Sequence, residues 1–204
     1  MGLGDWLADK FSSAPEEVVQ EGPPPAGMTP TAAPALPDVP VVPDAQEKAV
    51  LDMIAKCEGT FGVDGYHALY GWKPGDYTRL FSSYNDHPRI KFYLNGTKVP
   101  DGVKPAPYTY TTAAGRYQWT ASSWDDMLRR HGDCDFSPQS QDVMTLNKLD
   151  ELGATADIHA GNLQAAIDKM GGTWASLPTS KANQPTRTFD FCCAAFTEAG
   201  GTLA

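Results

Sequence analysis

The sequence predicts an α+β protein, in which a mainly helical bundle faces a small β lobe across a groove and an extended Pro-rich segment comes first. Three observations support this fold class. Nine of the 17 prolines lie in residues 1–44. Residues 61–112 alternate glycines and prolines with short aromatic or β-branched runs, and residues from 117 onward follow a helical periodicity. We therefore expect an extended segment, 1–44, and a globular domain, 45–204.

Charge and composition exclude several classes of function. The net charge of −9 argues against nucleic-acid binding, and residues 1–44, with seven acids and one lysine, hold −6 of it. No run of 18 apolar residues occurs, so we expect no stable membrane insertion, and the acidic start of the chain argues against a secretory signal. We expect buried thiols, no metal and no cofactor, because the cysteines form no metal-binding pattern. They are Cys57, Cys134, Cys192 and Cys193.

The Pro-rich composition of residues 1–44 predicts an extended spacer, because such a segment cannot bury enough apolar surface to order itself. Its tip is different. Leu3, Trp6, Leu7 and Phe11 recur at helical spacing. Residues 2–12 are therefore either a short amphipathic helix that docks in a groove of a partner protein or a frayed terminus.

The segment Ala45–Thr60 is predicted to be a helix that ends on a carboxylate. Asp44 and Glu47 have the spacing of a capping box, and Gly59 is a natural helix stop. Glu58 then lies at the negative end of the helix dipole, which raises the pKa of its carboxyl group, as partial burial also would. Glu58 is either a general acid for a glycosidic oxygen or a solvated helix-end residue. The apolar face of this helix is Val50, Leu51, Met53, Ile54 and Cys57.

Residues 61–112 predict an irregular β lobe with long loops. Asn95-Gly96 is a hairpin signal. Residues 61–93 are rich in aromatic side chains, and we expect at least half of them to form the core of the lobe and the rest to line a groove suited to stacking on sugar rings. These aromatic residues are Phe61, Tyr66, Tyr70, Trp72, Tyr77, Phe81, Tyr84, Phe92 and Tyr93.

The second half of the chain predicts helices over 122–130, from Ser137-Pro138 to Glu151, over 162–170 and over 188–199, with a short turn at 173–177. Serine followed by proline is a typical helix start, and glycines follow most of the predicted ends. The predicted acid, Glu58, thus stands where the first helix meets the β lobe. Two lobes with an acid between them are the layout of an enzyme that cleaves polysaccharides.

Several motifs, in this order, resemble the bacteriophage lambda endolysin family, which are peptidoglycan lytic transglycosylases with a lysozyme-like fold. The resemblance spans residues 47–202 and leaves residues 1–44 outside. The motifs are LDMIAKCEGT, Gly65-Tyr66, YNDHPR at 84–89, AAGRYQ at 113–118, FSPQSQD at 136–142, WASLP at 174–178 and EAGGT at 198–202. AAGRYQ alone would indicate only the wider lysozyme superfamily.

The resemblance implies roles for individual residues. Glu58 would be the catalytic acid/base, and peptidoglycan glycan strands would be the partner. For Arg116 we favour the role of a buried cation that braces the two lobes over a direct part in catalysis. The pattern departs from the family at Asp64 and His67, where the family has a histidine and an aspartate. The residues implied to line or brace the sugar groove are Thr60, Tyr66, His67, His87, Gly115, Tyr117 and Gln118.

The resemblance implies a transglycosylase, which cleaves the MurNAc-β-1,4-GlcNAc bond and leaves a 1,6-anhydro product. Phage T4-type lysozymes carry an aspartate nine residues after the catalytic glutamate, and here that position is His67. A hydrolytic muramidase and an inactive, lysozyme-like virion protein remain alternatives. The enzyme would either wait in the host cytoplasm for holin-dependent release or travel in the virion, and would act in the periplasm on the cell wall.

Overall fold

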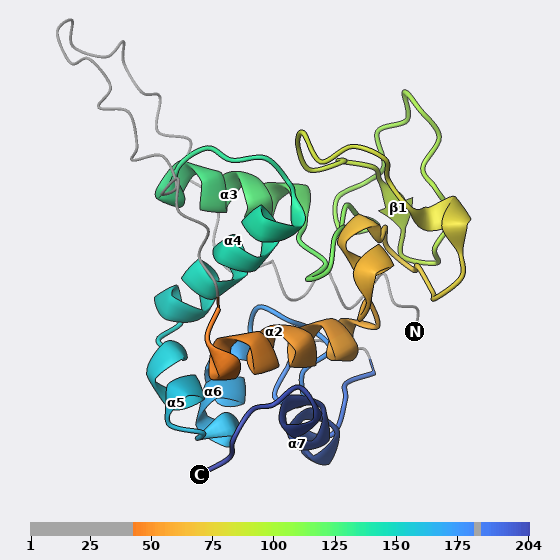
Figure 1. Cartoon of the computed structure of the whole chain (residues 1–204). Helices are drawn as coiled ribbons and strands as arrows, with labels where there is room; N and C mark the ends of the chain where they lie inside the picture. Colours follow the sequence, from red (N-terminus) through yellow and green to blue (C-terminus); the bar gives the residue numbers. More distant parts are fainter. Residues whose placement is uncertain (1–42, 182–184) are drawn as a thin grey trace, which may run out of the picture.

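The computed structural model describes residues 43–181 and 185–204 of the chain (Figure 1). Most of the Pro-rich segment, with the docking helix expected at 2–12, therefore lies outside the described residues. None of the helices in the described part is long and apolar enough to cross a membrane. The elements are α2 (Ala45–Glu58), η1 (Val63–His67), η2 (Tyr77–Arg79), β1 (Phe92–Tyr93), β2 (Tyr110–Thr111), α3 (Ala121–His131), α4 (Pro138–Glu151), α5 (Thr155–His159), α6 (Leu163–Met170) and α7 (Phe189–Glu198).

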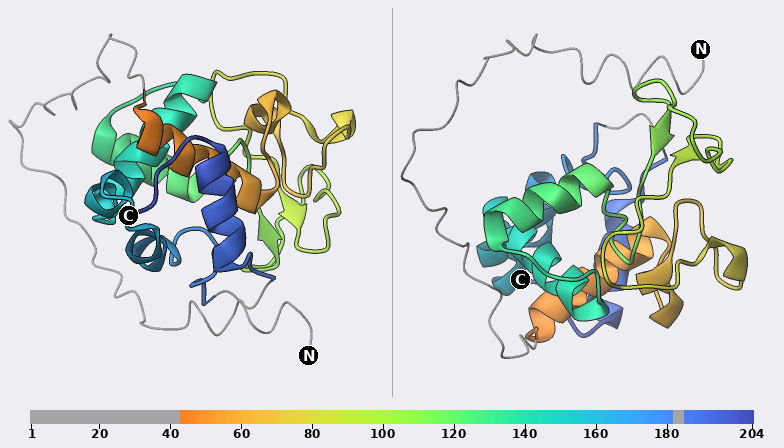
Figure 2. Two further views of the ribbon diagram at one scale, coloured as in Figure 1. Left: turned by 60° about the horizontal axis from the view of Figure 1, so that its bottom comes forward. Right: turned by 90° about the horizontal axis from the view of Figure 1, so that it is seen from above.

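Helix α2 is the central element of the fold. Helix α7 packs along it, and α4 and α5 also contact it. The β lobe lies beyond the C-terminal end of α2, whereas the helices gather around its body (Figures 1 and 2). The buried side of α2 contains all the apolar residues predicted from the sequence, because their three- and four-residue spacing places them on one face. They are Val50, Leu51, Met53, Ile54 and Cys57, and Ala49 and Ala55 are buried as well.

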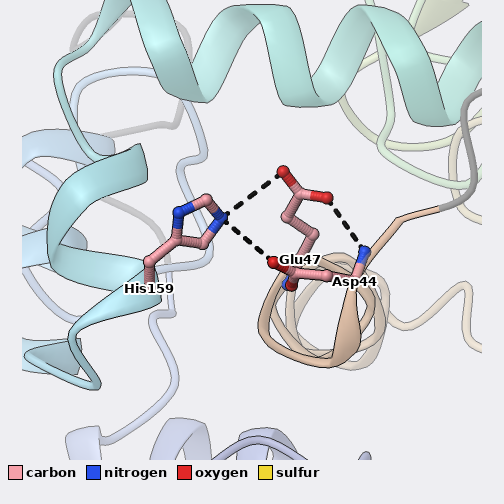
Figure 3. Close-up of side chains that lie close together, drawn as sticks. All are labelled: Asp44, Glu47 and His159. Carbon is pink, nitrogen blue, oxygen red and sulfur yellow. Dashed lines mark hydrogen bonds and ion pairs between the residues drawn. The ribbon is translucent and has the colours of Figure 1, made fainter.

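The N-terminal end of α2 has the predicted capping box. The Asp44 carboxylate accepts from the Glu47 N–H at 2.8 Å, and the Glu47 carboxylate accepts from the Asp44 N–H at 3.0 Å. The second oxygen of each carboxylate faces His159, whose Nε2 lies 3.5 Å from Asp44 and 3.4 Å from Glu47 (Figure 3). This arrangement satisfies two N–H groups that a helix start otherwise leaves unpaired.

The C-terminal end of the chain is held against the start of α2. Gln46 donates to the carbonyls of Ile158 and Thr202, both at 3.0 Å, and accepts from the Thr202 N–H at 2.7 Å. Ala204 N–H donates to the carbonyl of Gly161 at 3.1 Å. One glutamine side chain therefore joins three segments that are far apart in the sequence.

The β lobe is even less regular than the sequence suggests. Strands β1 and β2 have two residues each and pair antiparallel, with Phe92 opposite Thr111 and Tyr93 opposite Tyr110. The turn predicted at Asn95-Gly96 is present, since Gly96 has φ 88° and its N–H donates to Tyr93 at 2.8 Å. Loops therefore make up most of the lobe.

The helices of the second half lie close to their predicted ranges, but one was missed. Helix α5 has only five residues, and no side chain caps its N-terminal residue, Ala154. Such a helix leaves neither a start signal nor enough turns for a periodic pattern. The core beneath these helices is aromatic. Trp124 is fully buried and meets Phe136 edge-on at a ring separation of 4.6 Å.

Candidate active site

Glu58 is the last residue of α2, and its position is set by the end of that helix. Gly59 follows with φ 80°, and its N–H donates to the carbonyls of Ala55 and Lys56. This left-handed conformation is open to glycine at no steric cost. It ends the helix just after Glu58 and leaves the carboxyl group partly buried at the edge of a pocket.

The pKa of the Glu58 carboxyl group is raised from 4.5 to about 7. Burial is the main cause, because it disfavours the charged form. Two neighbours act in the opposite direction. Ser176 Oγ donates to Glu58 Oε1 at 2.7 Å, and the Arg187 guanidinium contributes its positive charge. Near neutral pH the group is therefore divided between the acid and the carboxylate, as a residue that both gives and takes a proton requires.

A pocket of about 950 Å³ adjoins Glu58. Its wall is formed by the end of α2, the loop around β2, the start of α3 and the turn at 173–175. Six aromatic side chains of the described residues line it, namely Tyr70, Tyr108, Tyr110, Tyr117, Trp119 and Trp174. Tyr117, Trp119 and Trp174 are buried in the wall. Tyr70, Tyr108 and Tyr110 are half-buried or exposed, so their rings are the flat apolar surfaces open to stacking on sugar rings. Of the aromatic residues that the sequence singled out at 61–93, only Tyr70 is among them.

Two of the predicted substrate-binding residues line this pocket, Tyr117 and Gln118. Gln118 has φ 51°, an unusual value for a residue other than glycine. Its side chain donates to the carbonyl of Gly115 at 3.0 Å, which holds the loop in this shape. Trp174 donates through Nε1 to the carbonyl of Tyr117 at 3.3 Å, so the two sides of the pocket are joined directly.

Thr60 and Gly115 lie behind the pocket wall rather than in it. Thr60 is buried and donates through Oγ1 to the carbonyl of Arg116 at 2.5 Å. Gly115 has φ 76°, and a Cβ at this position would lie 2.3 Å from Oε1 of Gln141. These contacts fix the loop that carries Tyr117, and they give both residues a positioning role.

Tyr66 belongs to a buried polar network beside Tyr117. Both hydroxyl groups donate to the Asp142 carboxylate, at 2.9 Å from Tyr66 and 2.5 Å from Tyr117. Arg116 lies 5.0 Å from the Tyr66 ring and forms an ion pair with Asp52. Arg116 is thus the buried cation that the sequence favoured, and it links α2 to the loop of residues 113–118.

His67 and His87 also have partners within the protein. His67 Nδ1 donates to the carbonyl of Phe81 at 2.9 Å, and its ring stacks on Tyr84 at 4.3 Å. His87 is buried, and its Nε2 donates to the carbonyl of Trp119 at 2.8 Å. Its Nδ1 accepts from the Arg89 N–H, so the ring is neutral. Burial lowers the pKa of His87, which agrees with this state. Neither histidine is among the residues that line the pocket.

Among residues 43–181 and 185–204, one carboxylate besides Glu58 lines the pocket, that of Asp125. Both of its oxygens accept from the Arg89 guanidinium, at 2.9 and 2.6 Å. This pairing lowers the pKa of Asp125 and keeps it charged. Asp64, the first acid after Glu58 in the sequence, is not among the lining residues.

Ser176 and Arg187 were not predicted as site residues. Arg187 donates through Nε to the carbonyl of Cys57 at 3.2 Å, and through its N–H to the carbonyl of Ser176 at 2.7 Å. Together they hold the turn at 173–178 against the end of α2. Ser176 falls within the WASLP motif, so the motif was the available signal, but its order in the sequence does not show that the hydroxyl reaches Glu58.

Comparison with known proteins agrees with this geometry. The endolysin family profile matches residues 48–203. The endolysin of Escherichia phage lambda is 38% identical over 164 residues, covering 78% of this chain and 93% of the relative. The endolysin of Escherichia phage P2 is 32% identical over 161 residues, covering 76% of this chain and 93% of the relative.

The solved structures agree as well. The lysozyme of bacteriophage lambda in complex with a chitohexasaccharide matches with a TM-score of 0.66 and 36% identity, over 80% of this chain and 99% of that one. A further structure of the lambda lysozyme has a TM-score of 0.65. The acid at the end of α2 and the aromatic pocket beside it thus stand in a lambda lysozyme fold, and the chain belongs to the endolysin family.

Proposed function

We propose that this endolysin is a lytic transglycosylase, which cleaves the β-1,4 bond between N-acetylmuramic acid and N-acetylglucosamine in peptidoglycan and leaves a 1,6-anhydro product. Glycan strands fit the aromatic pocket, and the lambda lysozyme, a relative of this chain, has been crystallised with a chitohexasaccharide. Glu58 is the catalytic residue of the proposal. Gln118 is the substrate-binding residue that the pocket supports best, whereas Tyr117 is a buried residue of its wall, with its hydroxyl group bonded to Asp142.

The mechanism needs one group that changes its protonation state. Protonated Glu58 gives its proton to the glycosidic oxygen, and the bond from that oxygen to C1 of the muramic acid breaks. The Glu58 carboxylate then takes the proton of the C6 hydroxyl group of the same sugar, and this oxygen bonds to C1. Because the nucleophile belongs to the substrate, its high effective concentration replaces an activated water molecule.

The observation that carries the proposal is the state of the pocket carboxylates. A hydrolytic glycosidase generally uses two carboxyl groups, one on each side of the bond. Asp125, which lines the pocket with Glu58, has both oxygens engaged by Arg89. Of these two carboxyl groups, Glu58 is the one that no cation holds in an ion pair, and one such group suffices for a transglycosylase.

The products of the reaction test the proposal. Purified peptidoglycan digested in water enriched in ¹⁸O should give muropeptides that end in anhydro-muramic acid, lighter by one water than hydrolytic products and without label. Reducing muramic acid that carries ¹⁸O would instead identify a hydrolytic muramidase. Glu58→Gln should abolish both kinds of product, and a lack of clearing by the wild type in a zymogram would identify an inactive binding protein.

The route to the wall is a separate question. We propose release from the host cytoplasm at lysis, in line with the endolysin family, with a holin as the pore-forming partner. Residues 1–12 would serve instead as an anchor if the enzyme is carried in the virion. Protein detected in purified particles, and lost from them when residues 1–12 are deleted, would identify the virion-associated route.

A further inference from the structure

Two cysteines from distant parts of the sequence meet in the core. Cys57 is in the last turn of α2 and Cys192 is in the first half of α7. Their Sγ atoms lie 3.7 Å apart, and the two residues are 3% and 0% exposed. Helix α7 lies next to the C-terminal half of α2 in Figure 1, and the two helices cross in the left view of Figure 2. The packing of these two helices alone therefore brings the thiols into contact.

The surroundings of the pair give the two thiols different pKa values. The two thiols share a hydrogen bond in which either sulfur can be the donor, and this bond raises the pKa of Cys57 and lowers that of Cys192. The Arg187 guanidinium favours the charged form of both sulfurs. Cys192 is thus the thiol of the pair that ionises more readily, and the thiolate is the form that attacks disulfides.

We propose that Cys57 and Cys192 are a modification site, where a small disulfide oxidant such as oxidised glutathione converts the pair into an intramolecular disulfide. A disulfide needs an Sγ–Sγ separation of about 2.05 Å, so the two sulfurs must approach one another from 3.7 Å. Neither Cys134 nor Cys193 is recorded in such a contact with another thiol among the described residues. The inference depends on the packing of α2 and α7 and not on the proposed reaction.

The chemistry is a two-step thiol–disulfide exchange. The Cys192 thiolate attacks one sulfur of the oxidised glutathione, which breaks its S–S bond and releases one glutathione thiolate. Cys57 then loses its proton and attacks Cys192 Sγ, which releases the second glutathione. Two cysteine thiols are oxidised, one glutathione disulfide is reduced to two thiols, and the two protons pass to the leaving thiolates.

Burial controls the rate and the consequence of this reaction. Because both sulfurs are buried, the oxidant reaches them when α7 opens locally or before it packs during folding. The bond would close a loop between residues 57 and 192 and fasten α7 to the helix that carries Glu58. Loops of this length give the largest entropic stabilisation in the chain-entropy model. Reducing compartments keep such pairs as thiols, whereas oxidising ones allow the disulfide.

The test uses the full chain refolded in glutathione redox buffer, followed by alkylation in denaturant and peptide mapping. Wild type and the double variant Cys134→Ser/Cys193→Ser should each lose two free thiols, with the cross-link mapped to Cys57 and Cys192. The melting temperature should rise by about 10 °C on oxidation and fall again with dithiothreitol. The matched control Cys192→Ser should show no shift that depends on dithiothreitol.

Two outcomes would overturn the proposal. In the first, the double variant keeps both thiols free at equilibrium with an excess of oxidised glutathione. In the second, the wild-type cross-link maps to Cys193 or Cys134 instead. Both results are read from the wild type or the double variant, so they do not depend on whether Cys192→Ser folds well.

Discussion

Replacing the proposed catalytic acid with its neutral counterpart, Glu58→Gln, should stabilise the protein at alkaline pH and abolish its activity. The pKa of Glu58 is about 7 in the folded protein against an ordinary value of 4.5. The folded state therefore holds this proton more tightly than the unfolded chain does. Stability is full below pH 4.5, falls as pH rises from 4.5 to about 7, and stays at its lower value above that.

The size of the effect follows from the pKa shift. A shift from 4.5 to about 7 corresponds to about 3 kcal/mol, at 1.36 kcal/mol per unit. The carboxyl group lies at the edge of a solvated pocket, which reduces the expected value to roughly 2 kcal/mol. Glutamine cannot ionise, yet its side-chain oxygen can still accept from Ser176. Glu58→Gln should therefore gain about this amount relative to wild type between pH 5 and pH 8.

Urea denaturation of both proteins at pH 5 and pH 8 measures this difference. Glu198→Gln is a suitable control, because Glu198 is a surface residue paired with Lys56 and its replacement should change stability by less than about 0.5 kcal/mol at either pH. In a zymogram Glu58→Gln should lose at least about 100-fold in activity. An equal free-energy difference between Glu58→Gln and wild type at both pH values would refute the perturbed acid, and with it the general-acid mechanism.

Three further predictions concern the groups around the acid. Activity in a turbidity assay should fall as pH rises through about 7, where Glu58 ionises. Ser176→Ala should move this decline to higher pH, because the Ser176 hydroxyl group favours the ionised form of Glu58. Gly115→Ala should lower the free energy of unfolding, measured in urea, by roughly 3 kcal/mol or more, since its Cβ would meet Gln141. The control Gly102→Ala, at φ +79° but with open space around it, should lower it by about 1 kcal/mol. Arg116→Met should cost roughly 2 kcal/mol, because it removes the buried partner of Asp52 and leaves this carboxylate paired with the exposed Lys48 alone. Adding Asp52→Asn should recover part of that loss.

Short-range sequence patterns were sufficient to predict the ends of the helix that carries Glu58. The capping box of Asp44 and Glu47 and the stop at Gly59 fix both ends of α2, and so they fix where Glu58 stands. The Asn95-Gly96 turn and the Ser137-Pro138 helix start are also local. Each of these signals depends on residues within about four positions of one another, so the order of the residues alone is enough to recognise it.

The rest of the site depends on contacts between distant segments. Ser176 reaches Glu58 across 118 positions of the chain, and no spacing rule predicts such a hydrogen bond. Within the AAGRYQ motif, Gly115 faces Gln141 of α4, whereas Gln118 lines the pocket. The motif identifies the loop, but the packing of α4 behind it decides which of its residues face the pocket.

The hydrogen bonds of Gln46, which hold the C-terminal end of the chain against the start of α2, affect how this enzyme can be joined to a carrier. Both ends of the described domain, near Pro43 and at Ala204, are gathered at the start of α2, whereas Glu58 is at the opposite end of the same 14-residue helix, about 20 Å away at 1.5 Å per residue. A linker, tag or scaffold joined at either end of the described domain would therefore be attached on the side away from Glu58. The pocket beside Glu58 would then face away from the point of attachment. An enzyme built in this way can work on a fixed, insoluble mesh while tethered.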